Sequence, residues 1–205
     1  MILCCLINLA WNNMEEIEVK FLDINITDIE QKLVSIGAQR IGETLSKITN
    51  FDYPDYRLKE KKAWVRLRSE FGKTTIAYKQ RLGAGFEDGS VSDKGMKEIE
   101  IEVSDFNIAN SFLKSIGLIE KFSQERKRIR WEKDSIEFDI DTWPLVPSYI
   151  EIEGDSIENI KKVSEELGFN WQEHFIGSFG QVCRKYGLND HDYSVFTFDK
   201  QIKKQ

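Results

Sequence analysis

Charged and apolar side chains alternate along several short stretches of this chain, and this period of two constrains the fold more than any other feature. Successive side chains of a β-strand point to opposite faces, so each stretch would carry one charged and one apolar face. With a β-prone stretch around residues 41–51, these stretches predict about eight strands, a number that can close into a barrel. The alternating stretches are Glu16–Phe21, Trp64–Arg68, Thr75–Arg81, Glu98–Val103, Arg126–Trp131, Ile136–Asp141 and Tyr149–Glu153.

Three segments between these strands have the apolar spacing of helices, and each is followed by a glycine that would end it. Together with the strands they predict an α+β fold in which helices cover the apolar outside of a barrel. The charged strand faces would then point inward. The predicted helices are Ile29–Ser35, Ile108–Ser115 and Ile157–Glu166, followed by Gly37, Gly117 and Gly168.

The chain is predicted to form one domain, at residues 14–187, because 205 residues with 40% hydrophobic side chains can bury a single core. Residues 1–13 are interpreted as an N-terminal extension and Met14 as a candidate translation start, which an intact mass that begins at Met1 would contradict. A last helix is expected from about Phe175 to Lys185, and the polar tail at 188–205 is expected to bury little.

Two loops stand out between the predicted strands. The stretch from Gly83 to Gly95 is rich in glycine and acidic residues and is interpreted as a lid. The stretch from Trp143 to Pro147 contains two prolines, which are expected to exclude regular ladder pairing there.

Composition argues against several classes of protein. A net charge of -6 does not favour general nucleic-acid binding, and the apolar start is too short to span a membrane. The cysteines, Cys4, Cys5 and Cys183, match neither a disulfide framework nor a zinc site. His174 and His191 are interpreted as surface or helix-flanking residues rather than catalytic ones, and Cys183 as a core residue rather than a nucleophile. We therefore expect a cytoplasmic protein with no membrane or nucleic-acid partner.

The charged strand faces combine acidic and basic residues in a way that suits one class of ligand. A triphosphate needs arginine and lysine donors, and the Mg²⁺ or Mn²⁺ that accompanies it needs carboxylate oxygens. The acidic positions are Glu16, Glu18, Glu98, Glu100, Glu102, Asp141, Glu151 and Glu153, and the basic positions are Lys20, Arg66, Arg68, Lys79, Arg126 and Arg128.

An ordinary antiparallel sheet with one wet face is the alternative interpretation of any single strand. It accounts less well for all of them together. Three separate Glu-Ile-Glu stretches and two Arg-x-Arg stretches are hard to explain by solvation alone.

The same residues resemble the CYTH superfamily, or triphosphate tunnel metalloenzymes, which includes class IV adenylate cyclases, thiamine triphosphatases and inorganic triphosphatases. Glu16-x-Glu18-x-Lys20 is similar to the family's first strand, and Val65-Arg66-Leu67-Arg68 to its paired-arginine strand. The stretch from Arg126 to Trp131 resembles a Lys-x-Arg-x-x-aromatic strand, but Arg126 stands in the place of the lysine. The resemblance implies a closed antiparallel eight-stranded barrel around a triphosphate.

The resemblance also implies roles for the charged residues. We predict Glu16, Glu18, Glu151 and Glu153 as metal ligands, and Glu98, Glu100 and Glu102 as further acidic residues of the tunnel. Phosphate binding is predicted for Lys20, Arg66, Arg68, Lys79, Arg126 and Arg128, and catalytic roles for Lys20, Arg66, Arg68, Lys79 and Asp141.

Three functions agree with this set of residues. A metal-dependent triphosphatase that acts on inorganic triphosphate, thiamine triphosphate or a similar substrate is the first, because hydrolysis needs only the tunnel. A class IV adenylate cyclase acting on ATP is the second, although the sequence identifies no adenine site. A non-catalytic polyphosphate binder is the third, and the acidic residues argue against it.

Overall fold

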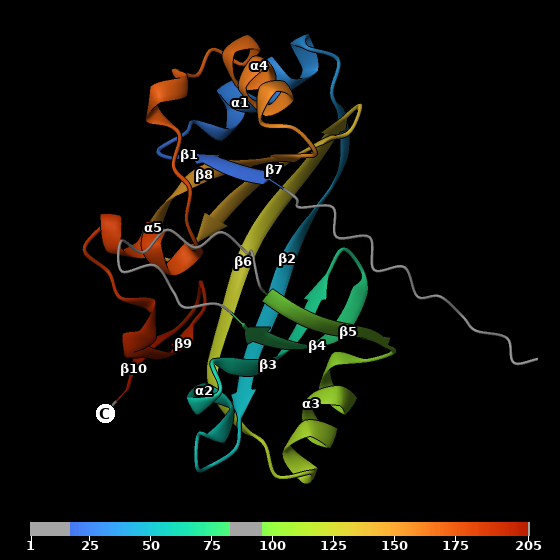
Figure 1. Cartoon of the computed structure of the whole chain (residues 1–205), viewed down its shortest axis with the longest axis vertical. Coiled ribbons are helices and arrows are strands. Elements are labelled where there is room, and N and C mark those ends of the chain that lie inside the picture. Colours follow the sequence, from blue (N-terminus) through green and yellow to red (C-terminus); the bar gives the residue numbers. More distant parts are fainter. Residues whose placement is uncertain (1–16, 83–95, 205) are drawn as a thin grey trace, which may run out of the picture.

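The computed structural model describes residues 17–82 and 96–204. The strands of its main sheet lie in the order β1-β8-β7-β6-β2-β3-β4-β5, and every neighbouring pair is antiparallel (Figure 1). These strands are β1 (Ile17–Phe21), β2 (Gln39–Asp52), β3 (Ala63–Glu70), β4 (Lys73–Arg81), β5 (Met96–Val103), β6 (Ile119–Lys133), β7 (Ile136–Trp143) and β8 (Val146–Gly154). The predicted strands are all present.

The sheet is curved but is not closed by hydrogen bonds, which corrects the prediction of a closed barrel. Within the described ranges, no ladder joins β1 to β5 at the two ends of the strand order. Another segment uses the second edge of β1: the Lys20 amide donates to the Phe175 carbonyl and the Phe175 amide donates to the Lys20 carbonyl, each at 2.8 Å. This isolated bridge occupies the Lys20 amide and carbonyl, which are then not free to pair with another strand on that edge.

Three ten-residue helices cover the outer face of the sheet, as predicted: α1 (Ile26–Ser35), α3 (Phe106–Ser115) and α4 (Ile157–Glu166). Each begins at a side-chain cap, from Asn25, Asp105 and Ser156 respectively. Each is followed by a glycine with φ between 80° and 95°, a conformation that disfavours other residues.

The helices divide the outer core into two parts, seen at the top and bottom of Figure 1. Helices α1 and α4 cover an apolar cluster that contains Val19, Phe138 and Ile152. Helix α3 covers a second cluster, built around Phe51 and Leu67. The long strands β2 and β6 run between the two parts and join them.

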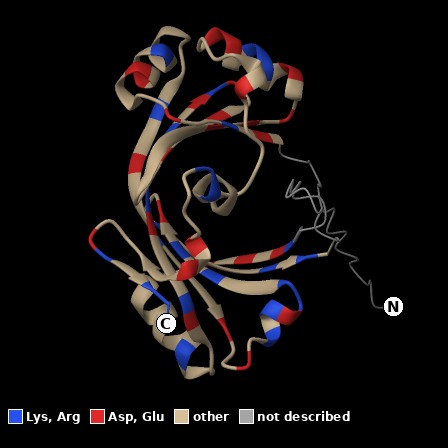
Figure 2. Cartoon of the chain, turned by 90° about the vertical axis from the view of Figure 1, so that its left-hand side faces the viewer, with Lys and Arg blue, Asp and Glu red and all other residues tan. Residues whose placement is uncertain are grey.

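A further helix, α5 (Phe179–Lys185), packs on the inner face of the sheet rather than on its outside. Its Val182 and Cys183 are buried against Ile48, Trp143 and Tyr149. Figure 2 shows α5 between the upper and lower parts of the curved sheet. The prediction that the helices lie outside is therefore wrong for α5, whose first residue also falls later than predicted because Phe175 pairs with β1.

The C-terminal tail forms two short strands and buries aromatic side chains, so the expectation that it buries little is wrong. Strand β9 (Tyr193–Phe196) pairs in parallel with β6 beside Ser123 and Gln124, and β10 (Gln201–Lys203) pairs with β9. Tyr193 and Phe196 are buried. The remaining elements are the short helix α2 (Arg57–Glu60) and the 3-10 turns η1 (Trp171–Glu173) and η2 (Asp190–Asp192).

The proline-containing stretch after β7 is a tight hairpin rather than a loop without pairing. Trp143 pairs with Val146 across a turn at Pro144 and Leu145, and the φ angle of Leu145 is 62°. Pro147 lies within β8. The predicted lid at 83–95 and the N-terminal extension lie outside the described residues. No helix in the described ranges is long and apolar enough to cross a membrane.

Replacing Phe196 with alanine should lower the free energy of unfolding by about 3–5 kcal/mol, because its fully buried ring packs against Phe122 and Tyr193. Urea denaturation followed by circular dichroism measures this loss. The matched control is Phe198→Ala, which removes a ring that is only partly buried. Equal effects of the two substitutions would contradict the role of Phe196 as the core of the tail.

Candidate functional site

The charged residues of the strands share one face of the sheet, which we call the inner face. The strand register establishes this: Lys20 lies opposite Glu151, Arg128 opposite Asp141, and Lys79 opposite Glu98. Figure 2 shows basic and acidic positions distributed along these strands. The described charged residues of the inner face include Glu18, Lys20, Arg66, Arg68, Glu70, Lys73, Lys79, Arg81, Glu98, Glu100, Glu102, Arg126, Arg128, Arg130, Glu132, Glu137, Asp139, Asp141, Glu151 and Glu153.

Lys20 is the most deeply buried basic residue of the inner face, with 1% of its surface exposed. Its Nζ lies 3.2 Å from Glu151 Oε1 and forms a second ion pair with Glu18. Burial lowers the pKa of Lys20, but the charges of Glu151 and Glu18 outweigh burial and raise the pKa above its ordinary value. Lys20 therefore remains an ammonium inside the protein.

Arg126 and Arg128 on β6 form a buried cluster with Asp141 on β7. Arg128 contacts both carboxylate oxygens of Asp141, at 2.7 Å each, and Arg126 donates to Asp141 at 3.0 Å. Arg128 also donates to Glu151 at 2.6 Å. Although burial raises the pKa of Glu151, the neighbouring Lys20, Arg128 and Arg126 reverse this effect and hold it at about 2.

Glu70 connects this cluster to the lower part of the sheet. Its Oε1 accepts from Arg126 at 2.5 Å and from the Ser46 hydroxyl at 2.6 Å. Burial would raise the pKa of Glu70, but Arg126 and Arg128 lower it to about 2. An ionised Glu70 thus links β3 to β6 across β2.

The lower part of the inner face carries the second group of basic residues. Arg66 donates to Glu98 and Glu100 at 3.2 Å, and Lys79 lies 2.9 Å from Glu98. Arg68 lies 3.5 Å from Glu70. Burial and then the adjacent Arg66 lower the pKa of Arg68, so a further negative charge at this position would stabilise its guanidinium.

Two buried guanidinium nitrogens retain capacity to donate. Within the described part of the chain, neither Arg66 Nε nor Arg126 Nε has a hydrogen-bond acceptor. A buried donor without a partner costs about 1–3 kcal/mol, so an anionic ligand that reached either atom would remove this cost.

The carboxylates of the inner face outnumber its basic groups, and this excess negative charge limits which charged ligands can bind there. A highly charged anion alone would be repelled by the excess negative charge. Divalent cations would offset it. The chemistry of Glu18, Glu151 and Glu153 fits Mg²⁺ or Mn²⁺, because both prefer hard carboxylate oxygens.

The geometry of these three glutamates is only partly that of a metal site. Glu18 and Glu153 lie opposite each other on β1 and β8, while the ammonium of Lys20 lies between Glu18 and Glu151. In residues 17–82 and 96–204, no three His, Cys, Asp or Glu side chains form a group that could hold a metal ion. Glu16, the fourth predicted ligand, lies outside the described residues.

One end of the inner face is closed by aromatic packing against α5. Trp143 stacks on Phe179 with 3.7 Å between ring centroids, and its Nε1 donates to the Tyr149 hydroxyl at 2.8 Å. The guanidinium of Arg126 lies 5.5 Å from the Trp143 ring. The basic cluster is therefore bounded on this side by an apolar wall.

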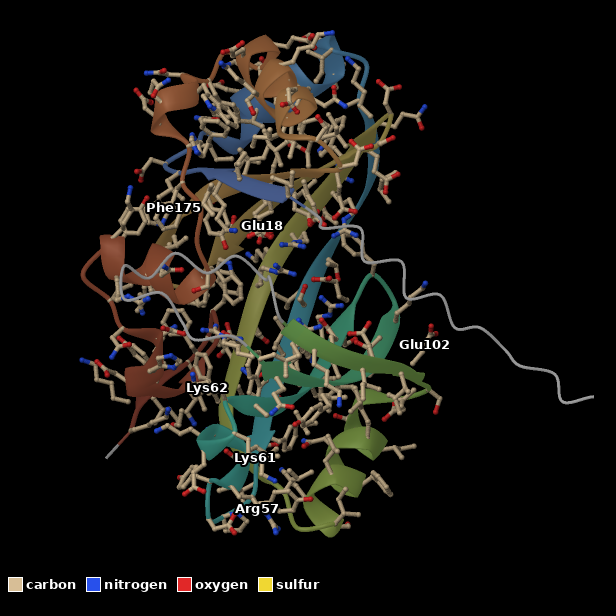
Figure 3. The ribbon with its side chains drawn as sticks, in the orientation of Figure 1. Glu18, Arg57, Lys61, Lys62, Glu102 and Phe175 are labelled. Carbon is tan, nitrogen blue, oxygen red and sulfur yellow. The ribbon has the colours of Figure 1, made fainter. Side chains whose placement is uncertain are left out.

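The structure brings the predicted residues with described side chains to this one face. Figure 3 shows Glu18 on β1 and Glu102 on β5, in the upper and lower parts of the sheet. Seven further members were not predicted from the sequence: Glu70, Lys73, Arg81, Arg130, Glu132, Glu137 and Asp139. The signal was present, because each continues the period of two in its own strand.

Cys183, His174 and His191 lie apart from the charged cluster. Burial raises the pKa of the Cys183 thiol to about 12, so it remains protonated. His174 stacks on Trp171 at 4.4 Å, and His191 is exposed. Cys183 is buried as a core residue, His191 lies at the surface, and His174 flanks η1, in agreement with the sequence-based interpretation.

The CYTH domain family model matches residues 14–175 of the chain. A search of curated proteins gave no match. The matched range includes all the predicted site residues.

Several solved structures share the fold. The PH1012 protein of Pyrococcus horikoshii OT3 is 23% identical, with a TM-score of 0.59 over 78% of this chain and 94% of that protein. A Vibrio parahaemolyticus protein described as a candidate adenylate cyclase is 13% identical, with a TM-score of 0.63 over 82% and 96% of the two chains. The Hippeastrum protein HpAC1, a candidate adenylyl cyclase described as having a dominant triphosphatase activity, is 16% identical, with a TM-score of 0.57 over 84% and 96%.

Replacing Glu70 with glutamine should reduce the free energy of unfolding at pH 7 by about 1–3 kcal/mol, because Arg126 loses a charged partner. The pKa of Glu70 is about 2, below its ordinary value of 4.5, so this stabilisation is present above pH 4.5 and is lost as the pH falls toward 2. Denaturant titrations across this range should show the variant and the wild type converging. The control, Glu165→Gln, removes an exposed pair with Lys161 and should change stability little. A Glu70 variant with a constant deficit at every pH would contradict the assignment.

Proposed function

Because this chain belongs to the CYTH domain family, we propose that it is a divalent-metal-dependent enzyme that hydrolyses a triphosphate bound along the inner face. The observation that carries the proposal is the gathering of buried and half-buried basic groups on one face of the sheet. Arg126 and Arg128 are only 8% and 7% exposed, and carboxylates hold both guanidiniums in fixed positions. Fixed, partly desolvated guanidiniums are suited to phosphate oxygens.

The two parts of the sheet supply two groups of phosphate ligands. Lys20, Arg126 and Arg128 lie in the upper group, and the lower group contains Arg66, Arg68 and Lys79. A chain of three phosphates placed between them would meet basic side chains along its length. Asp141 keeps two guanidiniums in place and is proposed as a positioning residue.

Glu18, Glu151 and Glu153 are proposed to hold the divalent cation, with Glu16 as a further ligand. When bound, the cation would neutralise charge on phosphate oxygens and orient the substrate. Lys20 would then release its contact with Glu18 or Glu151 and donate to a phosphate oxygen instead. The excess of carboxylates on the inner face therefore favours a substrate that binds together with a divalent cation.

Hydrolysis breaks the bond between the terminal phosphorus and its bridging oxygen. Water supplies the oxygen that bonds to the phosphorus, and the products are diphosphate, phosphate and a proton. The arginines and Lys20 would stabilise the negative charge on the transferred group and on the leaving diphosphate. Such positioning and charge stabilisation account for most of the catalysis expected in phosphoryl transfer.

Hydrolysis is favoured over cyclisation by the wall at the α5 end of the inner face. A cyclase must also position a nucleoside so that its ribose hydroxyl attacks the α-phosphorus. The polar groups of Trp143 and Tyr149 are already joined to each other, and the Trp143 ring is covered by Phe179. The triphosphatase activity described for the Hippeastrum protein supports the same choice.

The proposal is tested by incubating purified protein with inorganic triphosphate, thiamine triphosphate and ATP, in the presence of Mg²⁺ or Mn²⁺. Release of phosphate supports a triphosphatase. Formation of cyclic AMP and diphosphate from ATP identifies a cyclase, and binding without turnover identifies a non-catalytic polyphosphate binder.

Changing Glu18 to glutamine should reduce metal-dependent turnover by about a hundredfold or more, because the substitution removes a charged oxygen ligand without changing the side-chain shape. Steady-state rates over a range of Mg²⁺ concentrations measure the effect. The matched control is Glu43→Gln, which breaks a pair with Arg40 on the exposed surface. Full activity of the Glu18 variant would remove this residue from the metal site.

Changing Arg68 to alanine should weaken triphosphate binding by about tenfold or more, since a guanidinium hydrogen bond to a charged group is lost. Calorimetry with inorganic triphosphate and Mg²⁺ gives the affinity. Arg57→Ala is the control, because Arg57 is 54% exposed on α2, away from the inner face. An unchanged affinity would show that Arg68 does not bind the triphosphate and that the charged face of β3 is an ordinary solvent-facing surface.

A further inference from the structure

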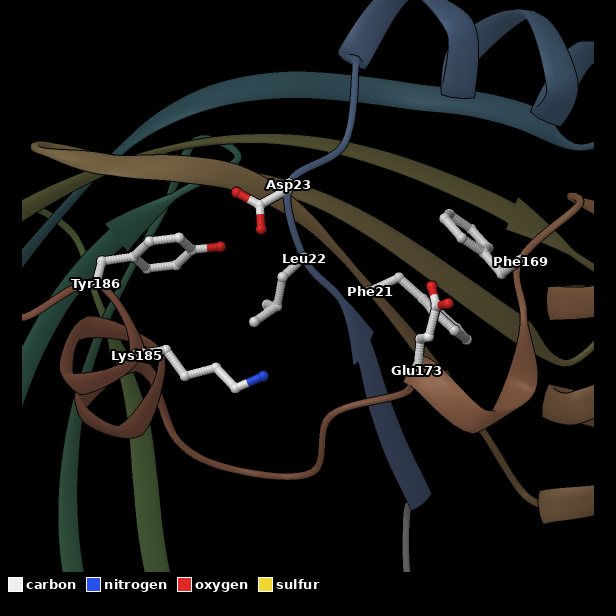
Figure 4. A pocket seen from close by; sticks show the side chains of 7 residues that line it. All are labelled: Phe21, Leu22, Asp23, Phe169, Glu173, Lys185 and Tyr186. Carbon is white, nitrogen blue, oxygen red and sulfur yellow. The ribbon is translucent and has the colours of Figure 1, made fainter.

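A pocket of about 420 Å³ lies outside the inner face, where the end of β1 meets the end of α5 (Figure 4). Phe21 and Phe169, whose rings stack at 4.2 Å, form its apolar side. Asp23, Glu173 and Lys185 contribute charged groups. The volume is within the range of about 300–1,000 Å³ that is usual for small-molecule sites.

The residues that line this pocket are all different from the charged residues of the inner face. The side chains of Leu22 and Tyr186 line the pocket and also belong to the apolar cluster under α5. A ligand here would therefore occupy a site separate from the proposed triphosphate site. Its binding can be tested whether or not the proposed reaction takes place.

The charges around the pocket are not paired with one another. Figure 4 shows the Lys185 ammonium directed into the pocket, with the carboxylates of Asp23 and Glu173 on other sides of it. Within the described ranges, no ion pair joins Lys185 to either carboxylate, and its Nζ lies over the Phe175 ring at 5.0 Å from the centroid. Two carboxylates and one ammonium around an apolar floor are complementary to a ligand that carries both signs of charge.

The Tyr186 hydroxyl adds a hydrogen-bond donor to this pocket. Its oxygen is buried and has no hydrogen-bond partner that meets normal geometry among the described residues. In Figure 4 it points toward Asp23. Burial, then a hydrogen-bonding interaction with Asp23 and the charge of its carboxylate, raise the pKa of Tyr186 to about 12, so the hydroxyl keeps its proton at neutral pH.

From this arrangement we infer that the pocket is a second binding site, for a small zwitterionic amine such as a free amino acid with an apolar side chain. The ammonium of the ligand would lie between Asp23 and Glu173. Its carboxylate would bind Lys185, its side chain would pack near Phe21, and the Tyr186 hydroxyl would help to hold Asp23 in place. Because the ligand would contact both β1 and α5, its binding should stabilise the folded protein.

L-Phenylalanine is a suitable probe, and calorimetry of the full chain without metal or triphosphate measures its binding. Two analogues separate the two charges: 2-phenylethylamine lacks the carboxylate, and 3-phenylpropionate lacks the amine. We expect saturable binding of L-phenylalanine and at least about tenfold weaker binding of each analogue, because each loses one charged contact. No binding of L-phenylalanine, or equal binding of either analogue, would overturn the inference.

Two variants locate the site. Asp23 has a left-handed backbone with φ 58°, which asparagine tolerates, so Asp23→Asn should keep the local fold. This substitution should weaken L-phenylalanine binding by about tenfold. Lys185→Gln changes an exposed side chain and should have a similar effect. The matched control is Asp134→Asn, an exposed residue with φ 52° at the turn between β6 and β7, and its affinity should equal that of the wild type. Wild-type affinity in both pocket variants, with their melting temperatures unchanged, would show that the probe binds elsewhere and would overturn the assignment.

Discussion

The structure depends on the pairing of ionised groups across the inner face of one curved sheet. An unpaired charge buried inside a protein costs several kcal/mol, so each buried arginine or lysine here requires a carboxylate close by. The pairs extend from Glu70 through Arg126 and Asp141 to Arg128 and Glu151. This network joins strands from both parts of the sheet and fixes the positions of the groups proposed to bind phosphate.

The outer face explains how a face with so many charges can be tolerated. Strand alternation places an apolar residue behind nearly every charged one, and α1, α4 and α3 cover these residues in two separate clusters. Much of the apolar burial that favours folding is therefore on the outside of the sheet, and a further apolar cluster lies under α5 on the inner face. A ligand that replaces one carboxylate contact of the basic groups by another anionic contact need not disturb these clusters.

Much of this arrangement could be predicted from the sequence, because period-two patterns and capping residues are local. Alternating stretches such as Glu98-Ile-Glu100 predicted the eight main strands. The glycines that follow the helices predicted where the three outer helices end. Contacts between segments that are distant in the sequence could not be predicted in this way. No local pattern indicates that Phe175 pairs with β1, that α5 turns inward, or that Phe196 is buried by the tail. The closed barrel was overpredicted for this reason, since strand number alone does not reveal what occupies the edge of β1.

The pairing of Phe175 with Lys20 is made entirely by main-chain atoms. Nearly any amino acid could make the same two hydrogen bonds, and only proline lacks the amide that one of them needs. Related proteins could therefore retain this connection while the residue at the position diverges freely. Conservation of side chains would give no indication of it, although it ties the segment leading to α5 to the strand that carries Lys20, the most deeply buried lysine among the described residues.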